Sequence, residues 1–188
     1  MINKFFKYSF LASFLIFVFF SCTKEVNFNQ INDLSLKPVI ASNLIFFNAP
    51  ASNFFVDGNE LVSIKDSIII DLFNRGFVVD NLVKAEFIFE TTNSINRAFS
   101  VQIDFLNTTN EPKHSFTVTT QASPTNTNIV TTHTEVFENN LLNALKTSNK
   151  IVLTIRALSG GTPLNDNTPG IIQLKSKGIF YLKIEKSE

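Results

Sequence analysis

Apolar and polar residues alternate along much of the chain from residue 44 onward. A period of two is typical of a β-strand with one buried face and one wet face. Clusters of turn-forming residues separate these runs at 91–96, 107–113 and 159–170. Many short strands at this spacing predict an all-β fold, an antiparallel β-sandwich of immunoglobulin-like character. The alternating positions are Val83, Ala85, Phe87 and Phe89; Phe99, Val101, Ile103 and Phe105; Phe116, Val118 and Thr120; and Ile151, Leu153, Ile155 and Ala157.

The same alternation, in which odd and even positions of a strand face opposite sides (its parity), predicts which side chains meet in the core. Residues two apart share one side of a strand, so we expect Phe87 and Phe89 to pack against the face that carries Phe105. Glu86 and Gln102 stand at the alternate positions and are expected to face solvent.

One stretch has the spacing of a helix instead. Phe137, Leu141 and Leu145 stand four residues apart, which predicts one short helix near residues 135–147. A strand over residues 129–136 is expected to precede it. The helix is expected to pack across a sheet edge or to close one end of the sandwich.

Glycines mark two further features. Asp57-Gly58 lies between apolar runs and predicts a hairpin, because glycine adopts positive φ at no steric cost. Gly178 is expected to mark a bulge or bend in the last run, residues 171–184. Residues 67–73 are largely apolar and are expected to form a mostly buried strand.

The first residues of the chain have a different pattern. Lys4 and Lys7 precede an almost wholly apolar run at residues 10–20, and Ser21 places a small residue directly before Cys22. The run is too short for a transmembrane helix, which needs about 20 apolar residues. It fits the apolar region of a secretory signal peptide instead.

The sequence Phe19-Phe20-Ser21-Cys22 resembles the lipobox of bacterial lipoproteins, although Phe19 replaces the usual leucine and Phe20 replaces the usual small residue. The resemblance implies that residues 1–21 are a cleaved lipoprotein signal peptide. It also implies that Cys22 is lipidated and becomes the mature N-terminus. Lipidation would account for the only cysteine of the chain, which has no partner for an internal disulfide.

Three alternatives stay open for this segment: an ordinary cleaved signal that leaves Cys22 as a free thiol, a signal anchor over residues 2–20, and a core helix. The stretch that follows is polar and weakly periodic. It predicts a tether over residues 22–43, followed by the β-sandwich domain over residues 44–188.

The residues behind the cysteine bear on location. In many Gram-negative lipoproteins an aspartate directly after the lipidated cysteine retains the protein in the inner membrane. Thr23 stands there in this chain, so the resemblance implies an outer-membrane lipoprotein. Acidic residues behind the cysteine mark surface display in some lineages, and Lys24-Glu25 is a short version of that pattern. The periplasmic face and the cell surface therefore both stay open.

Charge narrows the expected partners. Removal of residues 1–21 takes away Lys4 and Lys7, which leaves 14 basic and 16 acidic residues and a formal charge of −2. Binding of nucleic acid needs a clustered basic face, so no nucleic-acid partner is expected.

Candidate chemistry is sparse. His114 and His133 lie in Ser/Thr-rich alternating stretches and are expected to face solvent, and neither stands at the spacing of a metal ligand. Asn165-Asp166-Asn167 offers oxygen ligands for calcium, but the pattern favours an ordinary Asx-type turn. We therefore expect no catalytic, cofactor-binding or metal site.

These features together predict a non-enzymatic binding or scaffold module, held at a membrane by its lipid anchor, with an envelope protein or glycan as its partner. Two alternatives belong to other classes. A carrier would hold an apolar ligand in a cavity between the sheets. An envelope hydrolase would need a cleft that holds titratable groups with perturbed pKa values.

Overall fold

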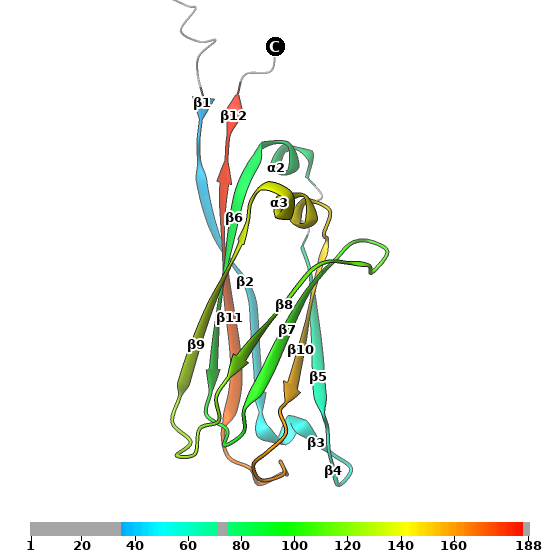
Figure 1. The fold of residues 1–188 in the computed structure, drawn as a ribbon, viewed down its shortest axis with the longest axis vertical. Coiled ribbons are helices and arrows are strands. Elements are labelled where there is room, and N and C mark those ends of the chain that lie inside the picture. Colours follow the sequence, from blue (N-terminus) through cyan, green and yellow to red (C-terminus); the bar gives the residue numbers. More distant parts are fainter. Residues whose placement is uncertain (1–34, 71–74, 186–188) are drawn as a thin grey trace, which may run out of the picture. The chain divides into compact units, whose positions relative to one another are not determined.

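Two antiparallel sheets of four strands each pack face to face in the computed structural model, which describes residues 35–70 and 75–185 (Figure 1). This arrangement confirms the predicted all-β sandwich. One sheet has the order β2-β11-β6-β9, with strands Val39–Pro50, Ile171–Leu182, Leu82–Asn93 and Ile129–Phe137. The other has the order β5-β10-β7-β8, with strands Ser63–Ile69, Lys150–Ala157, Phe99–Leu106 and Pro112–Thr120.

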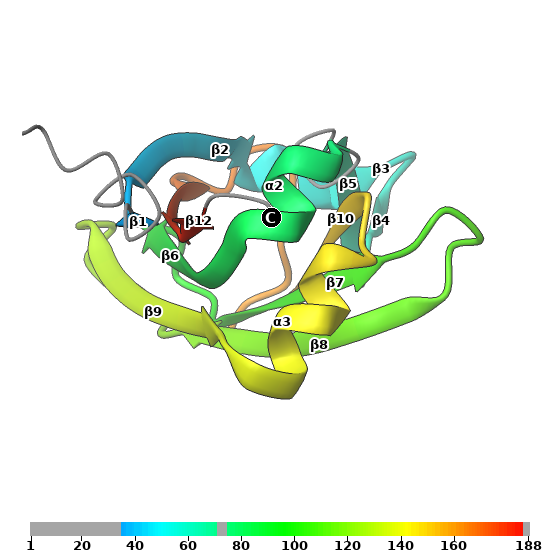
Figure 2. The same ribbon diagram turned by 90° about the horizontal axis from the view of Figure 1, so that it is seen from above.

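Short elements complete the two ends of the sandwich. The N-terminal end carries β1 (Ser35–Leu36), β12 (Ile184–Glu185), α2 (Gly76–Asn81) and α3 (Asn139–Lys146). Seen from above, both helices lie over this end of the sheets (Figure 2). The opposite end, called the loop end below, carries the 3-10 helix η2 (Ala51–Phe54) and the hairpin of β3 (Phe55–Val56) and β4 (Asn59–Glu60).

The strand order is that of a jelly roll, the eight-stranded form of the double-sheet sandwich. Among the described strands of the two large sheets, only β7 and β8 are consecutive in sequence and also neighbours in one sheet. All the remaining connections between these eight strands cross to the opposite sheet. An immunoglobulin domain distributes its strands in another order, so the immunoglobulin-like part of the prediction is corrected. Alternation shows that a strand has a buried face, but it does not show which sheet the strand joins.

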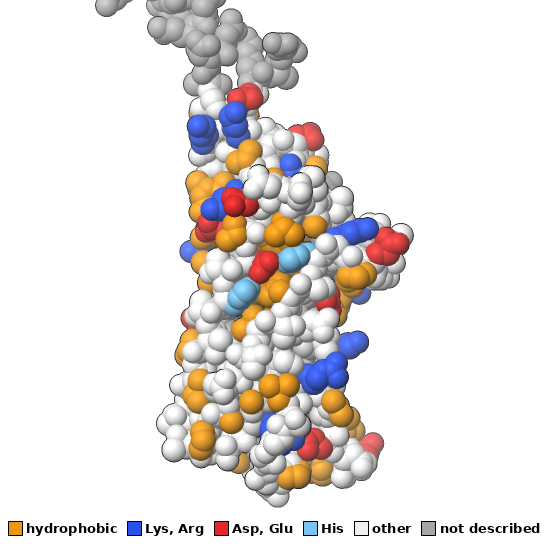
Figure 3. All heavy atoms as spheres, in the orientation of Figure 1, with side chains coloured by type: hydrophobic (Ala, Val, Ile, Leu, Met, Phe, Trp, Pro, Cys, Tyr) orange, Lys and Arg blue, Asp and Glu red, His pale blue; other side chains and the backbone are white. Residues whose placement is uncertain are grey.

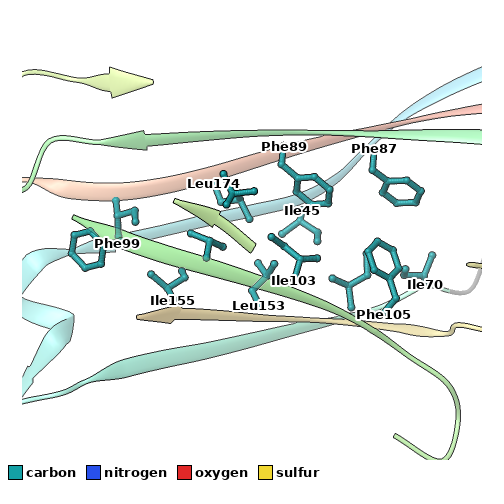
Figure 4. Close-up of a cluster of buried hydrophobic side chains, with 14 of the residues drawn as sticks. Ile45, Ile70, Phe87, Phe89, Phe99, Ile103, Phe105, Leu153, Ile155 and Leu174 are labelled. Carbon is teal, nitrogen blue, oxygen red and sulfur yellow. The ribbon is translucent and has the colours of Figure 1, made fainter. Parts of the chain in front are cut away.

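Phenylalanine rings fill the space between β6 and β7 (Figure 4). The ring of Phe87 is fully buried and lies edge to face against two other rings. Its centre is 5.4 Å from the ring centre of Phe105 and 5.8 Å from that of Phe180. Such aromatic pairs add about 0.5–1.5 kcal/mol beyond the burial of their area. Gln102 is exposed and Glu86 is half-buried on the outer face, so the predicted parity holds in the centre of both strands.

The parity fails at the start of β6, where Val83 is 47% exposed. The register between β6 and β11 shifts at this point, because Tyr181 faces Lys84 and the next residue, Leu182, faces Leu82. A β-bulge of this kind changes the side of the strand on which a residue lies. Leu82 therefore enters the core, and Val83 points outward.

Two strands begin earlier than the sequence predicts. β2 begins at Val39, which pairs with Tyr181, so the sheet starts within the stretch expected to be a tether. Residues 22–34 of that stretch lie outside the described residues. β5 spans Ser63–Ile69 and not residues 67–73, and most of it is exposed instead of buried. Both are edge strands, so each has a neighbouring strand on one side only.

The irregularity predicted in β11 is present at Ser176, close to Gly178. The register with β2 shifts between Lys175 and Lys177, and the backbone N–H of Ile45 donates to the Ser176 hydroxyl at 3.0 Å. Gly178 has a different reason to be glycine. A Cβ there would lie 2.7 Å from the ring of Phe180, closer than packed atoms allow.

The predicted hairpin and helix are both confirmed. Asp57 and Gly58 have φ values of 50° and 81°, as a turn between two hairpin strands requires. The helix is α3, but Phe137 belongs to the end of β9. Leu145 points into the core and Leu141 is exposed, so α3 closes the sandwich at the N-terminal end.

Candidate functional site

The one functional residue expected from the sequence, Cys22, lies outside the described residues, as does the signal peptide at 1–21. Its lipidation therefore stays a prediction. Within the described part of the chain, polar and exposed apolar groups gather at the loop end, at the N-terminal end and at the flank between β8 and β9. Phe46 and Ile68 also line a smaller hollow of about 150 Å³ between β2 and β5.

The loop end is formed by four connections that meet below the sheets in Figure 1. Their charged residues are three acids and one base, and most of their other residues are Asn, Thr, Ser, Gly and Pro. Loops held on a rigid scaffold are a common place for binding residues. The connections are residues 57–62, 94–98, 121–128 and 158–170.

Arg97 joins three of these connections, although it is only 9% exposed. Its Nη2 lies 2.6 Å from Oε1 of Glu60 in the β3–β4 hairpin. Its Nη1 donates to the backbone oxygens of Gly160 and Thr162. Charge-assisted hydrogen bonds of this kind are short, and the planar guanidinium fixes the geometry of the groups it joins. One guanidinium therefore holds the hairpin and the longest loop together.

Asparagine side chains attach the fourth connection. The buried Asn93 donates from Nδ2 to the backbone oxygens of Arg97, at 2.8 Å, and of Gln121, at 2.7 Å. Asn126 donates to the backbone oxygen of Ser94 at 2.9 Å. These bonds fix the loops to one another, so the polar surface at this end is ordered before any partner arrives.

The N-terminal end carries an apolar hollow of about 360 Å³. Val39 is 57% exposed and Val83 is 47% exposed, so two aliphatic side chains stand open to solvent in one place. The bulge in β6 is what turns Val83 toward the hollow. The lining residues are Lys37, Pro38, Val39, Val83, Tyr181, Leu182 and Lys183.

Charged groups surround the tyrosine of this hollow. The Tyr181 hydroxyl donates to Oε2 of Glu86 at 3.3 Å, and Nζ of Lys84 lies 5.4 Å from the centre of the Tyr181 ring. Lys84 also contacts Oε1 of Glu86 at 2.8 Å. This hydrogen bond lowers the pKa of Glu86 and raises the pKa of Lys84 from their ordinary values. The pair is therefore charged at neutral pH.

Both histidines bind one carboxylate at the flank between β8 and β9. Nε2 of His114 lies 2.7 Å from Oε1 of Glu135, and Nε2 of His133 lies 2.8 Å from Oε2 of the same residue. The ring of His133 stacks on Phe116 at 4.8 Å. Figure 3 shows the two histidines on either side of an acidic side chain, above an apolar surface.

The expectation that the two histidines face solvent is wrong for His114, whereas the His133 side chain is 36% exposed. The His114 side chain is 17% exposed, and it shares the inward parity of Phe116. β8 and β9 are edge strands of opposite sheets, so inward side chains there lie at the rim of the core. The two-residue spacing of His133 and Glu135 places both on one side of the predicted strand, but nothing in the sequence signals that His114 meets them.

Metal binding gains no support from these groups. The part of the chain that the structure describes holds no group of three His, Cys, Asp or Glu residues placed for a metal ion. The Asn165-Asp166-Asn167 segment forms the predicted Asx-type turn, since the backbone N–H of Asn167 donates to Oδ1 of Asn165 at 2.9 Å. Among the described residues, no helix has the length and apolar character to span a membrane.

The fold and these surfaces define a jelly-roll β-sandwich domain. No protein-family model matches the chain, and no curated protein matches it. A Parabacteroides distasonis protein that has been assigned as secreted is 13% identical, with a TM-score of 0.41 over 67% of this chain and 38% of that one. The VP2 subviral particle of infectious bursal disease virus is also 13% identical, with a TM-score of 0.40 over 82% of this chain and 33% of that one.

A CBM4 structure is 11% identical, with a TM-score of 0.31 over 69% of this chain and 81% of that one. The chain spans well under half the length of the first two of these proteins. At these identities and scores the likenesses are general ones, and no argument about function rests on them.

Proposed function

We propose that this chain is a non-enzymatic, lipid-anchored binding module of a bacterial outer membrane, which presents its loop end to an envelope protein or glycan. The observation that carries the proposal is the position of the first strand. β1 lies at the N-terminal end, and the four loop-end connections lie at the opposite end (Figure 1). An anchor at Cys22 would therefore hold one end near the bilayer and leave the other end free.

The order of the loop end supports a binding role. Arg97 and Asn93 fix its loops by hydrogen bonds. Binding of a partner would therefore lose little free energy to the ordering of these loops. The filled core favours surface binding over the alternative of an apolar carrier. Phe87, Phe105 and Phe137 are fully buried against one another, and a packed interior has no room for a ligand at that point.

The anchor is tested by metabolic labelling with a palmitate analogue in a bacterial host that processes lipoproteins. We expect the wild-type chain to be labelled and to sediment with outer membranes, and we expect Cys22→Ser to be unlabelled. Equal labelling of both chains would refute lipidation at Cys22. Protease treatment of whole cells then separates surface display, in which the domain is cut, from a periplasmic location, in which it is protected.

The binding surface is tested by a photo-crosslinking residue placed at Thr125 in the loop end, with Thr117 as the matched control. Both are exposed threonines, and Thr117 lies on the outer face of β8. We expect a discrete crosslinked product in intact cells from position 125 and not from position 117. The same product from both positions, or from neither, would count against the loop end as the binding surface.

A further inference from the structure

We propose that the N-terminal end of the sandwich rests on the phospholipid bilayer, with Val39 and Val83 at the level of the headgroups and the neighbouring lysines against lipid phosphates. This inference rests on the proposed anchoring at Cys22. It adds a second, non-covalent contact between the protein and the membrane. The contact would set the orientation of the domain as well as its distance from the bilayer.

The first support is the apolar surface. Single exposed apolar residues are normal on a protein, but Val39 and Val83 come from different strands and line one hollow. Leu36, the residue before Lys37, is 52% exposed as well. A bulge is a built feature of a strand, and here it removes Val83 from the core and places it in water.

The second support is the chemistry around that surface. Lys37 and Lys183 line the hollow, and Tyr181 forms part of its wall. Tyrosine and lysine beside exposed aliphatic residues are the composition of surfaces that lie at a membrane interface, where an apolar body meets a polar, anionic layer. The loop end has no lysine in its four connections.

Local charge is compatible with this occupant. Lys37, Lys84 and Lys183 stand near two carboxylates, Glu86 and Glu185, and Glu138 also acts on Lys84. Three lysines and three carboxylates therefore balance around the hollow, whereas the chain from Cys22 onward has 14 basic and 16 acidic residues. Basic residues near the surface of an anionic leaflet are attracted to it within a Debye length.

The third support is the length of chain between the anchor and the fold. Residues 23–34 separate Cys22 from Ser35, where β1 begins. A fully extended chain of that length reaches at most about 45 Å. The hollow lies beside β1 and β12, so the anchor would keep it at high effective concentration near the bilayer. Even a weak contact with lipid would then be populated.

The test uses the full chain, purified in its lipidated form and reconstituted in vesicles of phosphatidylethanolamine and phosphatidylglycerol. Cys22 is the only natural cysteine, so lipidation leaves Val83→Cys as a single site for a fluorescent label. Val62→Cys is the matched control, since Val62 is 65% exposed and lies at the loop end. Lipids with a quencher near the headgroup report which label touches the bilayer.

We expect several-fold stronger quenching at position 83 than at position 62, and weaker quenching at 83 when Lys37→Glu and Lys183→Glu are added. A label at Val39→Cys should behave like the one at 83. Equal quenching at positions 83 and 62 would show that the hollow does not contact lipid, and it would overturn the docking. This result is also the one expected if the hollow is a contact site for another protein. Fluorescent labelling of the chain without an added cysteine would show a free Cys22, and it would overturn the anchoring and the docking together.

Discussion

The two ends of the sandwich differ in the chemistry of their surface residues. At the loop end, hydrogen bonds from Arg97 and Asn93 hold polar loops in place, and the charged residues of those loops are mainly acidic. At the N-terminal end, aliphatic side chains such as Val83 stand exposed beside lysines. The same two sheets run through both ends, so the difference arises in the connections and in local irregularities of the strands.

This contrast separates two ways in which a rigid sandwich can carry a surface. Buried hydrogen bonds give an ordered surface that is expensive to disturb, because each broken bond leaves an unpaired polar group. An exposed apolar surface costs little to change in the isolated protein and matters only when something covers it. Mutations at the loop end should therefore affect stability, and mutations at the N-terminal end should affect association.

The largest effect is expected in the core that both ends share. Phe87→Ala should lower the free energy of unfolding by about 3–5 kcal/mol, because it removes a buried ring and leaves a cavity. Gln102→Ala, on the outer face of β7, should change it by less than about 0.5 kcal/mol. Chemical denaturation of both variants measures the difference. If Gln102→Ala proves as damaging as Phe87→Ala, the assignment of inner and outer faces is wrong.

The next effect should be confined to the loop end. Arg97→Ala should cost about 2–3 kcal/mol, since it leaves Glu60 and two backbone oxygens without their donor in a largely buried place. Amide hydrogen exchange should quicken in residues 158–170 and stay unchanged in β1 and β12. Lys183→Ala, which removes an exposed ion pair at the other end, is the control and should change little. Faster exchange at both ends would remove the contrast between them.

A smaller and more local effect is expected at Gly170. Its φ is +102°, and an added Cβ would collide with the backbone of Ser94. Gly170→Ala should therefore cost about 2 kcal/mol, from positive φ and overpacking together. Gly160→Ala is the matched control, because Gly160 also has positive φ, +96°, but open space around it. Equal losses in the two variants would show that the loop end is less tightly packed than described.

The smallest effect concerns pH at the N-terminal end. The hydrogen bond from Lys84 lowers the pKa of Glu86 in the folded state, so this carboxylate stabilises the fold above its unfolded pKa. That contribution is lost as the pH falls through the lowered folded value. Glu86→Gln should therefore be slightly less stable than the wild type at neutral pH and equal to it in acid. Glu90→Gln, on the same strand, serves as the control for the substitution itself.

Much of the fold could be predicted from the sequence, because alternation and turn residues are local signals. The parity of Phe87 and Phe105 and the Asp57-Gly58 turn were predictable for this reason. The strand order was not, since six of the seven steps between the main strands cross from sheet to sheet and no local pattern encodes that crossing. The exposure of Val83 depends on a bulge, which shifts parity without any mark in the sequence.

The sites were harder to predict than the fold. His114 and Glu135 meet only because their strands lie at the same flank of the two sheets. Arg97 sits in a short loop, and its role depends on two distant segments that reach it after folding. Contacts between residues far apart in sequence depend on the order of the strands in the sheets. They cannot be predicted from the sequence pattern until that order is known.

The pairing of β2 with β11 also determines when this domain can be complete. Among the described strands, β2 pairs in its sheet only with β11, which begins far along the chain at Ile171. A ribosome or an export channel delivers residues in order, so β2 must wait for β11. Closing such a long loop precedes the gain from its contacts, which makes folding slow. A chain that has to pass through a narrow channel before it folds would be helped by this delay.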